Sequence, residues 1–373
     1  MSVWDELIGQ EKTVEQLKKA LEKPNHAWLF TGPPGSGRSN TARAFAAALE
    51  CEHHTGCGKC KACLTVLSGV NADVTVLATD KVTITIDEVR ALIAKSYDRP
   101  SVAPWRIIIV EDADRMTERT SNVLLKALEE PASRTIWMLC APSPADLLPT
   151  LRSRCQSVTL KIPHTDDIAR LLHERDGIDL DIARDMARIS QGHIGVARWL
   201  ATSKDARERR KRILSVTHKL STVGQAVRAA NFLVNTAKEQ AEASAEEFRE
   251  QDQEQLMHAL GVNPDETLPP YVRAHLKQLD EDYKRRSTRG QKDALDRMML
   301  DMLSFYRDVL LQQMSAKIEP MNVDMLAAIE KIASTSTAEQ TTQRIEKIKQ
   351  ARQRLTTNAA PLLTLEAMVL GLL

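Results

Sequence analysis

The sequence has no apolar run that approaches the ~20 residues of a membrane-spanning helix, so we do not expect a membrane protein. Its first residues, MSVWDELIGQEKTVEQL, mix acids and bases and lack an apolar signal region, which predicts a cytoplasmic protein. With 51 Lys and Arg against 50 Asp and Glu, the net charge is only +1, so any contact with nucleic acid depends on local basic patches. Aromatic residues, at 4%, count against a base-stacking surface.

The chain is long enough for several domains. Its 373 residues suit two or three domains with cores of their own, and we expect three. A hydrophobic content of 43% with 27% charged residues is ordinary for a globular protein. The sequence shows no triad of carboxylates of the kind that carries polymerase chemistry. Local motifs are therefore the informative features.

The first motif is a glycine-rich loop. A short apolar run, HAWLF, precedes GPPGSGRSN, and a segment rich in helix formers follows it, which predicts a buried strand, a turn and a helix. This is the setting of a phosphate-binding loop, made here of Gly32, Pro33, Pro34, Gly35, Ser36, Gly37, Arg38, Ser39 and Asn40.

Arg38 is the departure from the usual pattern, GxxxxGK followed by Ser or Thr, because it stands in place of the lysine. Arginine keeps the positive charge but is planar and longer than lysine. Nucleotide binding therefore stays open, fast hydrolysis does not follow, and the alternative is a glycine-rich turn without a ligand.

A second apolar strand is predicted at Ile107–Val110, and acids follow it directly. An ATP site usually has Asp and then Glu here, for magnesium and for orienting the attacking water. The order in this chain is Glu111 and then Asp112, which displaces each carboxylate by ~1 Å, and such a shift can cost ~100-fold in rate. Both halves of the nucleotide site are thus altered, unless the acids only cap the strand for solubility.

Four of the six cysteines are close in sequence: Cys51, Cys57, Cys60 and Cys63. In a reducing compartment such a cluster favours a metal over disulfides, and four thiolates complete a closed, structural zinc site. His53 and His54 are alternatives to Cys51 as the fourth ligand, and a reactive thiol pair is the alternative to zinc.

The motifs occur in a characteristic order. The glycine-rich loop, the cysteine cluster, EDADRMTERTSNVLLKALEEP and Ser153-Arg154-Cys155 follow one another. In combination they resemble the bacterial clamp-loader subunits of the AAA+ superfamily, the DNA polymerase III gamma/tau and delta-prime proteins. The resemblance implies an α/β then all-α fold: an AAA+ P-loop module with a parallel sheet and a zinc-knuckle insertion at 51–63 (residues 1–164), a small helical lid (165–205) and a helical collar domain (206–373).

The resemblance also implies roles for single residues. Arg154 corresponds to the family's arginine finger, which reaches the γ-phosphate of ATP held by a neighbouring subunit, and a guanidinium fork suits that charge. Arg198, in GVAR, is similar to the sensor-2 arginine that faces the subunit's own nucleotide. Arg38, the reversed acids and CAPSP at 140–144 are the departures expected of delta-prime, the stator, which hydrolyses little or no ATP itself.

The implied partners are the gamma/tau and delta subunits and, through the assembled ring, the sliding clamp and primed DNA. Whether ATP with magnesium occupies the chain's own pocket stays open. A catalytically active gamma/tau-like ATPase is the alternative within the family. A recombination or helicase-loading AAA+ protein is more remote, because such proteins generally lack the four-cysteine insertion.

Two further features have two interpretations each. The basic clusters Arg207–Arg212 and Lys284–Arg289 either contact DNA or form solvated faces balanced by acids. Leu295, Met299, Met302, Tyr306 and Val309 recur at helical spacing. This stripe packs either within its own domain or against another subunit.

Overall fold

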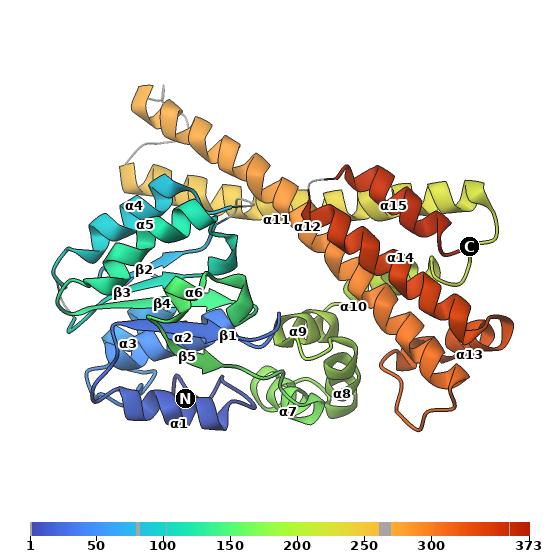
Figure 1. Ribbon diagram of the computed structural model, residues 1–373, viewed down its shortest axis with the longest axis horizontal. Helices are drawn as coiled ribbons and strands as arrows, with labels where there is room; N and C mark the ends of the chain where they lie inside the picture. Colours follow the sequence, from blue (N-terminus) through green and yellow to red (C-terminus); the bar gives the residue numbers. More distant parts are fainter. Residues whose placement is uncertain (1, 80–82, 102, 261–269, 358) are drawn as a thin grey trace. The chain divides into compact units, whose positions relative to one another are not determined.

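The computed structural model describes residues 2–79, 83–101, 103–260, 270–357 and 359–373 (Figure 1). The chain divides into two units, of which the first ends at Thr202 and the second comprises Ser203–Leu373.

A parallel sheet lies at the centre of the first unit. Within the described residues it has five strands in the order β2-β3-β4-β1-β5. They are β1 (Ala27–Thr31), β2 (Val74–Leu77), β3 (Arg106–Val110), β4 (Thr135–Ala141) and β5 (Gln156–Thr159). The central strands β3, β4 and β1 are buried along their whole length, as expected of continuous apolar runs in a sheet covered on both faces. The strands predicted before the glycine-rich loop and before the acids are thus confirmed.

Alternate residues of the central strands point to opposite faces of the sheet and build two separate cores. Trp28 and Ile109 belong to the core on one face, which is covered by α1 (Glu11–Ala20), α2 (Arg38–Leu49) and α3 (Lys61–Leu67). Leu29 and Ile108 belong to the other core, under α4 (Ile86–Ser96), α5 (Glu118–Glu129) and α6 (Pro149–Arg152). Two 3-10 turns, η1 (Ala113–Arg115) and η2 (Pro144–Asp146), follow β3 and β4.

Three short helices complete the first unit: α7 (Thr165–Asp176), α8 (Leu180–Ile189) and α9 (Ile194–Thr202). They share a small core of their own, to which each contributes, for example through Leu172, Ala183 and Ala197. Helix α7 ends where Gly177 adopts a left-handed conformation, with φ of 66°. A lid domain at 165–205 with boundaries of its own stays a prediction.

The second unit is helical in its described residues. It consists of α10 (Lys204–Ser215), α11 (Val223–Leu260), α12 (Pro270–Gln313), η3 (Val323–Met325), α13 (Leu326–Thr335), α14 (Ala338–Thr356) and α15 (Pro361–Leu370). The stripe predicted at Leu295 to Val309 lies on α12 and is buried in this unit's core. Tyr306 also donates a hydrogen bond from its hydroxyl to the carbonyl of Thr217, at 3.0 Å. The stripe is therefore part of the core of its own unit.

The predicted fold class, an α/β module followed by an all-α region, is confirmed. Among the helices of the described residues, none combines the length and the apolar character that a bilayer crossing requires.

Candidate functional site

The glycine-rich loop and the acids meet at one edge of the sheet. The loop follows β1 and the acids follow β3, and β4 separates these two parallel strands. Because the carboxyl ends of parallel strands lie at the same edge, the segments are neighbours there. An ion pair between Arg43 of α2 and Glu111 shows this directly, with 3.0 Å between Nη2 and Oε1.

The loop has the backbone that a phosphate requires. Gly37 caps α2 with a left-handed φ of 86°, so the first N–H groups of this helix lie directly after the loop. Ser39 and Asn40 lie in the first turn of α2. The Oγ of Ser36 is buried without a hydrogen-bond partner in the described residues. A buried, unsatisfied hydroxyl is the kind of group that a bound ligand or water satisfies.

Arg38 links the two ends of the loop. Its Nη1 donates to the carbonyl oxygen of Gly32 at 3.0 Å. The guanidinium therefore bonds to the loop itself. The more compact ammonium group of a lysine would not make the same contact.

The acids after β3 are not equivalent. Glu111 pairs with Arg43, and Asp112 pairs with Arg115, with 3.4 Å between Oδ2 and Nη2. Asp114 has a buried Oδ1 without a hydrogen-bond partner among the described residues. Burial raises the pKa of Asp114, and the charge of Asp112 raises it further. Glu111 and Asp112 are thus each paired with an arginine, while Asp114 has a carboxylate oxygen without a hydrogen-bond partner among the described residues.

His193, directly before α9, lies close to Gly35 of the glycine-rich loop. A Cβ atom on Gly35 would lie 2.9 Å from the Cα of His193, so glycine is required where the two segments meet. Arg198 of α9 forms an ion pair with Asp176 of α7, with 3.1 Å between Nη2 and Oδ1. Asp176 also accepts two bonds from Arg175, and these bonds, with nearby arginine charge, lower its pKa below the usual range against the effect of burial. In this structure Arg198 is engaged within the helical region, and its role toward a nucleotide stays a prediction.

Arg154 lies just after α6. The side chain is 34% exposed, and its Nη1 donates to the carbonyl of Thr150 at 2.7 Å and to the Oγ of Ser153 at 3.3 Å. Its Nη2 pairs with the carboxylate of Glu129, the last residue of α5. The guanidinium is therefore held in one orientation at the surface.

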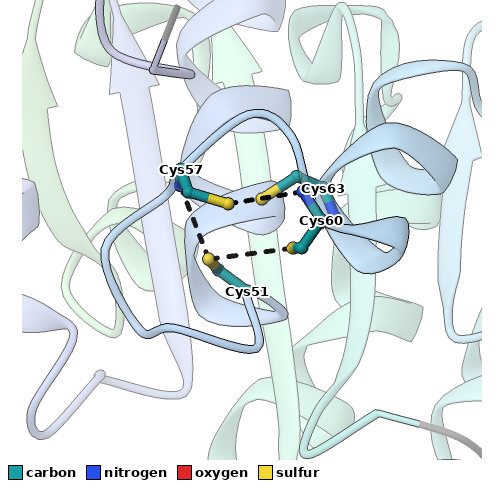
Figure 2. A group of neighbouring side chains, drawn as sticks. All are labelled: Cys51, Cys57, Cys60 and Cys63. Atoms are coloured by element: carbon teal, nitrogen blue, oxygen red, sulfur yellow. Dashed lines mark hydrogen bonds between the residues drawn. The ribbon is translucent and has the colours of Figure 1, made fainter.

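The four clustered cysteines converge in space, as Figure 2 shows. Their Sγ atoms all lie within 4.8 Å of one another, and those of Cys51 and Cys60 are 3.9 Å apart. Four sulfurs bound to zinc at ~2.3 Å would lie ~3.8 Å apart, so the cluster fits a tetrahedral metal. His53 and His54 are not part of this group of potential ligands among the described residues.

Backbone N–H groups already bond to the sulfurs. Cys57, Cys60 and Cys63 donate from their backbone nitrogens to the sulfurs of Cys51, Cys57 and Cys60, each at 3.4 Å. Burial opposes ionisation of Cys51, but N–H groups of Cys57, Thr55 and His53 lower its pKa to about 5. Burial raises the pKa of Cys63. The loop thus stabilises thiolate charge at Cys51, and the thiolate is the ligand form of cysteine.

The basic clusters are only partly available to a ligand. Arg210, within the first cluster, is 5% exposed and pairs with Asp301 at 3.1 Å. In the second cluster Arg289 pairs with Asp293 at 3.4 Å, and the side chains of Arg285 and Arg286 lie outside the described residues.

Sequence reasoning missed three residues of the site: Arg43, Glu129 and His193. Each of the three lies next to a predicted site residue that is distant in sequence, so no local sequence pattern identifies these three residues. Only the isolated charge of Arg43 in the alanine-rich helix after the loop was a signal.

Comparison with known proteins agrees with these motifs. A family model described as DNA polymerase III, delta subunit, matches residues 9–164. The chain is 33% identical over 164 residues to DNA polymerase III subunit tau of Bacillus subtilis. The aligned segment covers 42% of this chain and 29% of the relative. The chain is 34% identical over 143 residues to DNA polymerase III subunit delta' of Pseudomonas aeruginosa, covering 37% of this chain and 44% of the relative. The chain thus spans less than half the length of either relative.

A solved structure, a DNA polymerase III gamma subunit-related protein from Thermotoga maritima, aligns over 96% of this chain and 97% of its own. Its TM-score is 0.46, and the identity is 17%.

Proposed function

We propose that this chain, whose residues 9–164 match the family model described as DNA polymerase III, delta subunit, is a clamp-loader subunit of the AAA+ superfamily with the role of a delta-prime-like stator. In this role the subunit completes an ATP-driven ring that loads a sliding clamp onto primed DNA. It donates Arg154 to the ATP site of a neighbouring subunit and hydrolyses little or no ATP itself.

The observation that carries this proposal is a contrast between two arginines. Arg154 is partly exposed and held in one orientation, as an arginine that acts on another subunit requires. Arg38 is bound to the carbonyl of its own loop, and Arg43 neutralises Glu111, which follows β3. The catalytic group is thus presented outward, while the chain's own site lacks a free pair of acids for magnesium and water.

The chain's own pocket retains features of a phosphate site. Bound ATP would supply a polyphosphate for the N–H groups at the start of α2 and for the buried Oγ of Ser36. Near the predicted pair, Asp114 has a buried oxygen without a hydrogen-bond partner in the described residues, whereas Glu111 is paired with Arg43. The pocket therefore supports binding more than turnover.

The cysteine cluster supports a structural zinc site. Zinc would cross-link the loop, and Cys51, Cys57, Cys60 and Cys63 would hold it with no position left for water. Trp4 donates from Nε1 to the carbonyl of Thr55 at 2.9 Å, so the metal loop also anchors the N-terminal segment. This site stabilises the first unit and takes no part in catalysis.

The proposed partners and cellular location follow from this role. The partners are the gamma/tau and delta subunits, with the sliding clamp and primed DNA reached through the complex, and the location is the cytoplasm.

The test is ATP hydrolysis by a complex reconstituted with gamma/tau and delta subunits. Arg154→Ala should lower DNA-stimulated turnover by the neighbouring subunit by ~10³-fold, the scale of an arginine finger. Arg152→Ala, two residues earlier at the exposed end of α6, is the matched control. Unchanged turnover with Arg154→Ala would contradict the proposal.

A gamma/tau-like motor is the second candidate, and the retained loop with the buried Ser36 hydroxyl favours it. In that case the chain itself hydrolyses ATP, with arginine in the place of lysine. Turnover that is abolished by Arg38→Ala, and unaffected by mutations in the partner's loop, would establish this function.

A further inference from the structure

The orientation of Arg154 depends on a residue of another helix. Two of its three hydrogen-bond acceptors, Thr150 and Ser153, are in the same short segment as Arg154. The third acceptor, and the single charged one, is the carboxylate of Glu129, which lies 25 residues away in sequence.

Glu129 lies at the end of a well-packed helix. It is the last residue of α5, which ends there because a proline follows Glu130. Leu128, directly before it, is 0% exposed and packs in the core under the sheet. The carboxylate therefore projects from a fixed helix end, although the Glu129 side chain itself is 46% exposed.

The hydrogen bonds of Arg154 leave part of the guanidinium free. Of its five N–H donors, two on Nη1 bind Thr150 and Ser153, and one on Nη2 binds Glu129. Within the described residues the remaining donors are on Nε and Nη2, which are adjacent on one edge. Two adjacent N–H groups form the fork that binds two phosphate oxygens.

We propose that Glu129 is a positioning residue for Arg154, which orders the guanidinium before it meets a phosphate of a nucleotide bound to a neighbouring subunit. This inference rests on the proposed function. A free arginine side chain loses rotamer entropy when it docks, and ordering it in advance reduces that loss. Glu129 uses one N–H of Nη2, so the N–H of Nε and the second N–H of Nη2 are left for phosphate.

The experiment uses the complex reconstituted with gamma/tau and delta subunits and measures kcat and KM for ATP in the presence of primed DNA. Glu129→Gln should lower kcat about fivefold, the upper range for an exposed ion pair, with KM changed less than about twofold. Glu129→Asp, which keeps the charge on a shorter stem, should restore part of the rate. Glu130→Gln is the matched control, because Glu130 is the adjacent exposed acid and forms no ion pair within the described part of the chain.

A double-mutant cycle separates positioning from a general structural role. If Glu129 acts through Arg154, Glu129→Gln should have no further effect in an Arg154→Ala background. An unchanged kcat for Glu129→Gln, or the same loss in both backgrounds, would overturn the inference. If Arg154→Ala alone has no effect, the proposed function fails instead. Equal melting temperatures and equal incorporation into the complex establish that the variants are folded.

Discussion

Arg43 on α2 pairs with Glu111 at the end of β3, and this contact joins the two halves of the chain's own nucleotide site at 3.0 Å. The pair is partly buried, with side-chain exposures of 38% and 18%. A carboxylate paired in this way is a weak ligand for magnesium, because binding the cation requires the guanidinium to leave or to share it.

The first prediction concerns this pair. Arg43→Met should free the carboxylate of Glu111, so that magnesium strengthens nucleotide binding by about tenfold in the variant but has little effect in the unaltered chain. Titration with a fluorescent ATP analogue, with and without magnesium, measures the difference. Arg90→Met on α4 is the control, since Arg90 is exposed and pairs with Asp87. The same magnesium dependence in Arg43→Met and in the unaltered chain would show that Arg43 does not restrain Glu111.

A second prediction concerns the metal. The purified chain should contain about one zinc ion, and Cys57→Ser should lower this content and the thermal stability together. Elemental analysis and a melting curve with and without a chelator measure both effects. Cys155→Ser, outside the cluster, should leave the zinc content unchanged. Full zinc content in Cys57→Ser would exclude this cysteine as a ligand.

A third prediction is that the charge of Asp176 contributes to the pH dependence of the free energy of unfolding. Its pKa is lowered in the folded protein, so its contribution is present above the unfolded value of 3.8 and is lost as pH falls through the folded value. Asp176→Asn should therefore cost about 1–2 kcal/mol between pH 5 and 7, and the difference from the unaltered chain should shrink below pH 4.

Urea unfolding at several pH values measures this difference. The control is Asp181→Asn, because the Asp181 side chain is 90% exposed and its pair with Arg184 is long, at 3.5 Å. A pH-independent cost for Asp176→Asn would show that the carboxylate acts through packing and not through its charge.

A fourth prediction concerns the first basic cluster. Arg210→Met should destabilise the second unit by about 3 kcal/mol, because Asp301 would keep a buried charge without its partner. Lys211→Met, at the next and exposed position, should stay within about 0.5 kcal/mol. Denaturant unfolding measures both variants. Equal stability of the two would mean that Arg210 is not a structural residue.

The cluster's contact with DNA can be tested separately. If the exposed members touch DNA, Lys211→Met should reduce binding to primed DNA by the complex and make it less dependent on salt. Binding without that change would leave the cluster as a solvated face.

The fold was predictable where the pattern is local. Continuous apolar runs identified β1 and β3, since strands buried on both faces have no polar alternation. The stripe from Leu295 to Val309 identified one side of α12, although its spacing could not distinguish the core of its own unit from another subunit. The spacing of the four cysteines predicted their convergence, because short loops bring such residues together.

The sequence by itself determined which residues are able to do the chemistry: the glycine-rich loop, the acids after β3, Arg154 and the four cysteines. Only the tertiary structure decided which of them are engaged. Strand order brings Glu111 to Arg43, the end of α5 brings Glu129 to Arg154, and helix packing buries Arg210 against Asp301. These pairs join residues 68, 25 and 91 positions apart, and local periodicity carries no information over such separations.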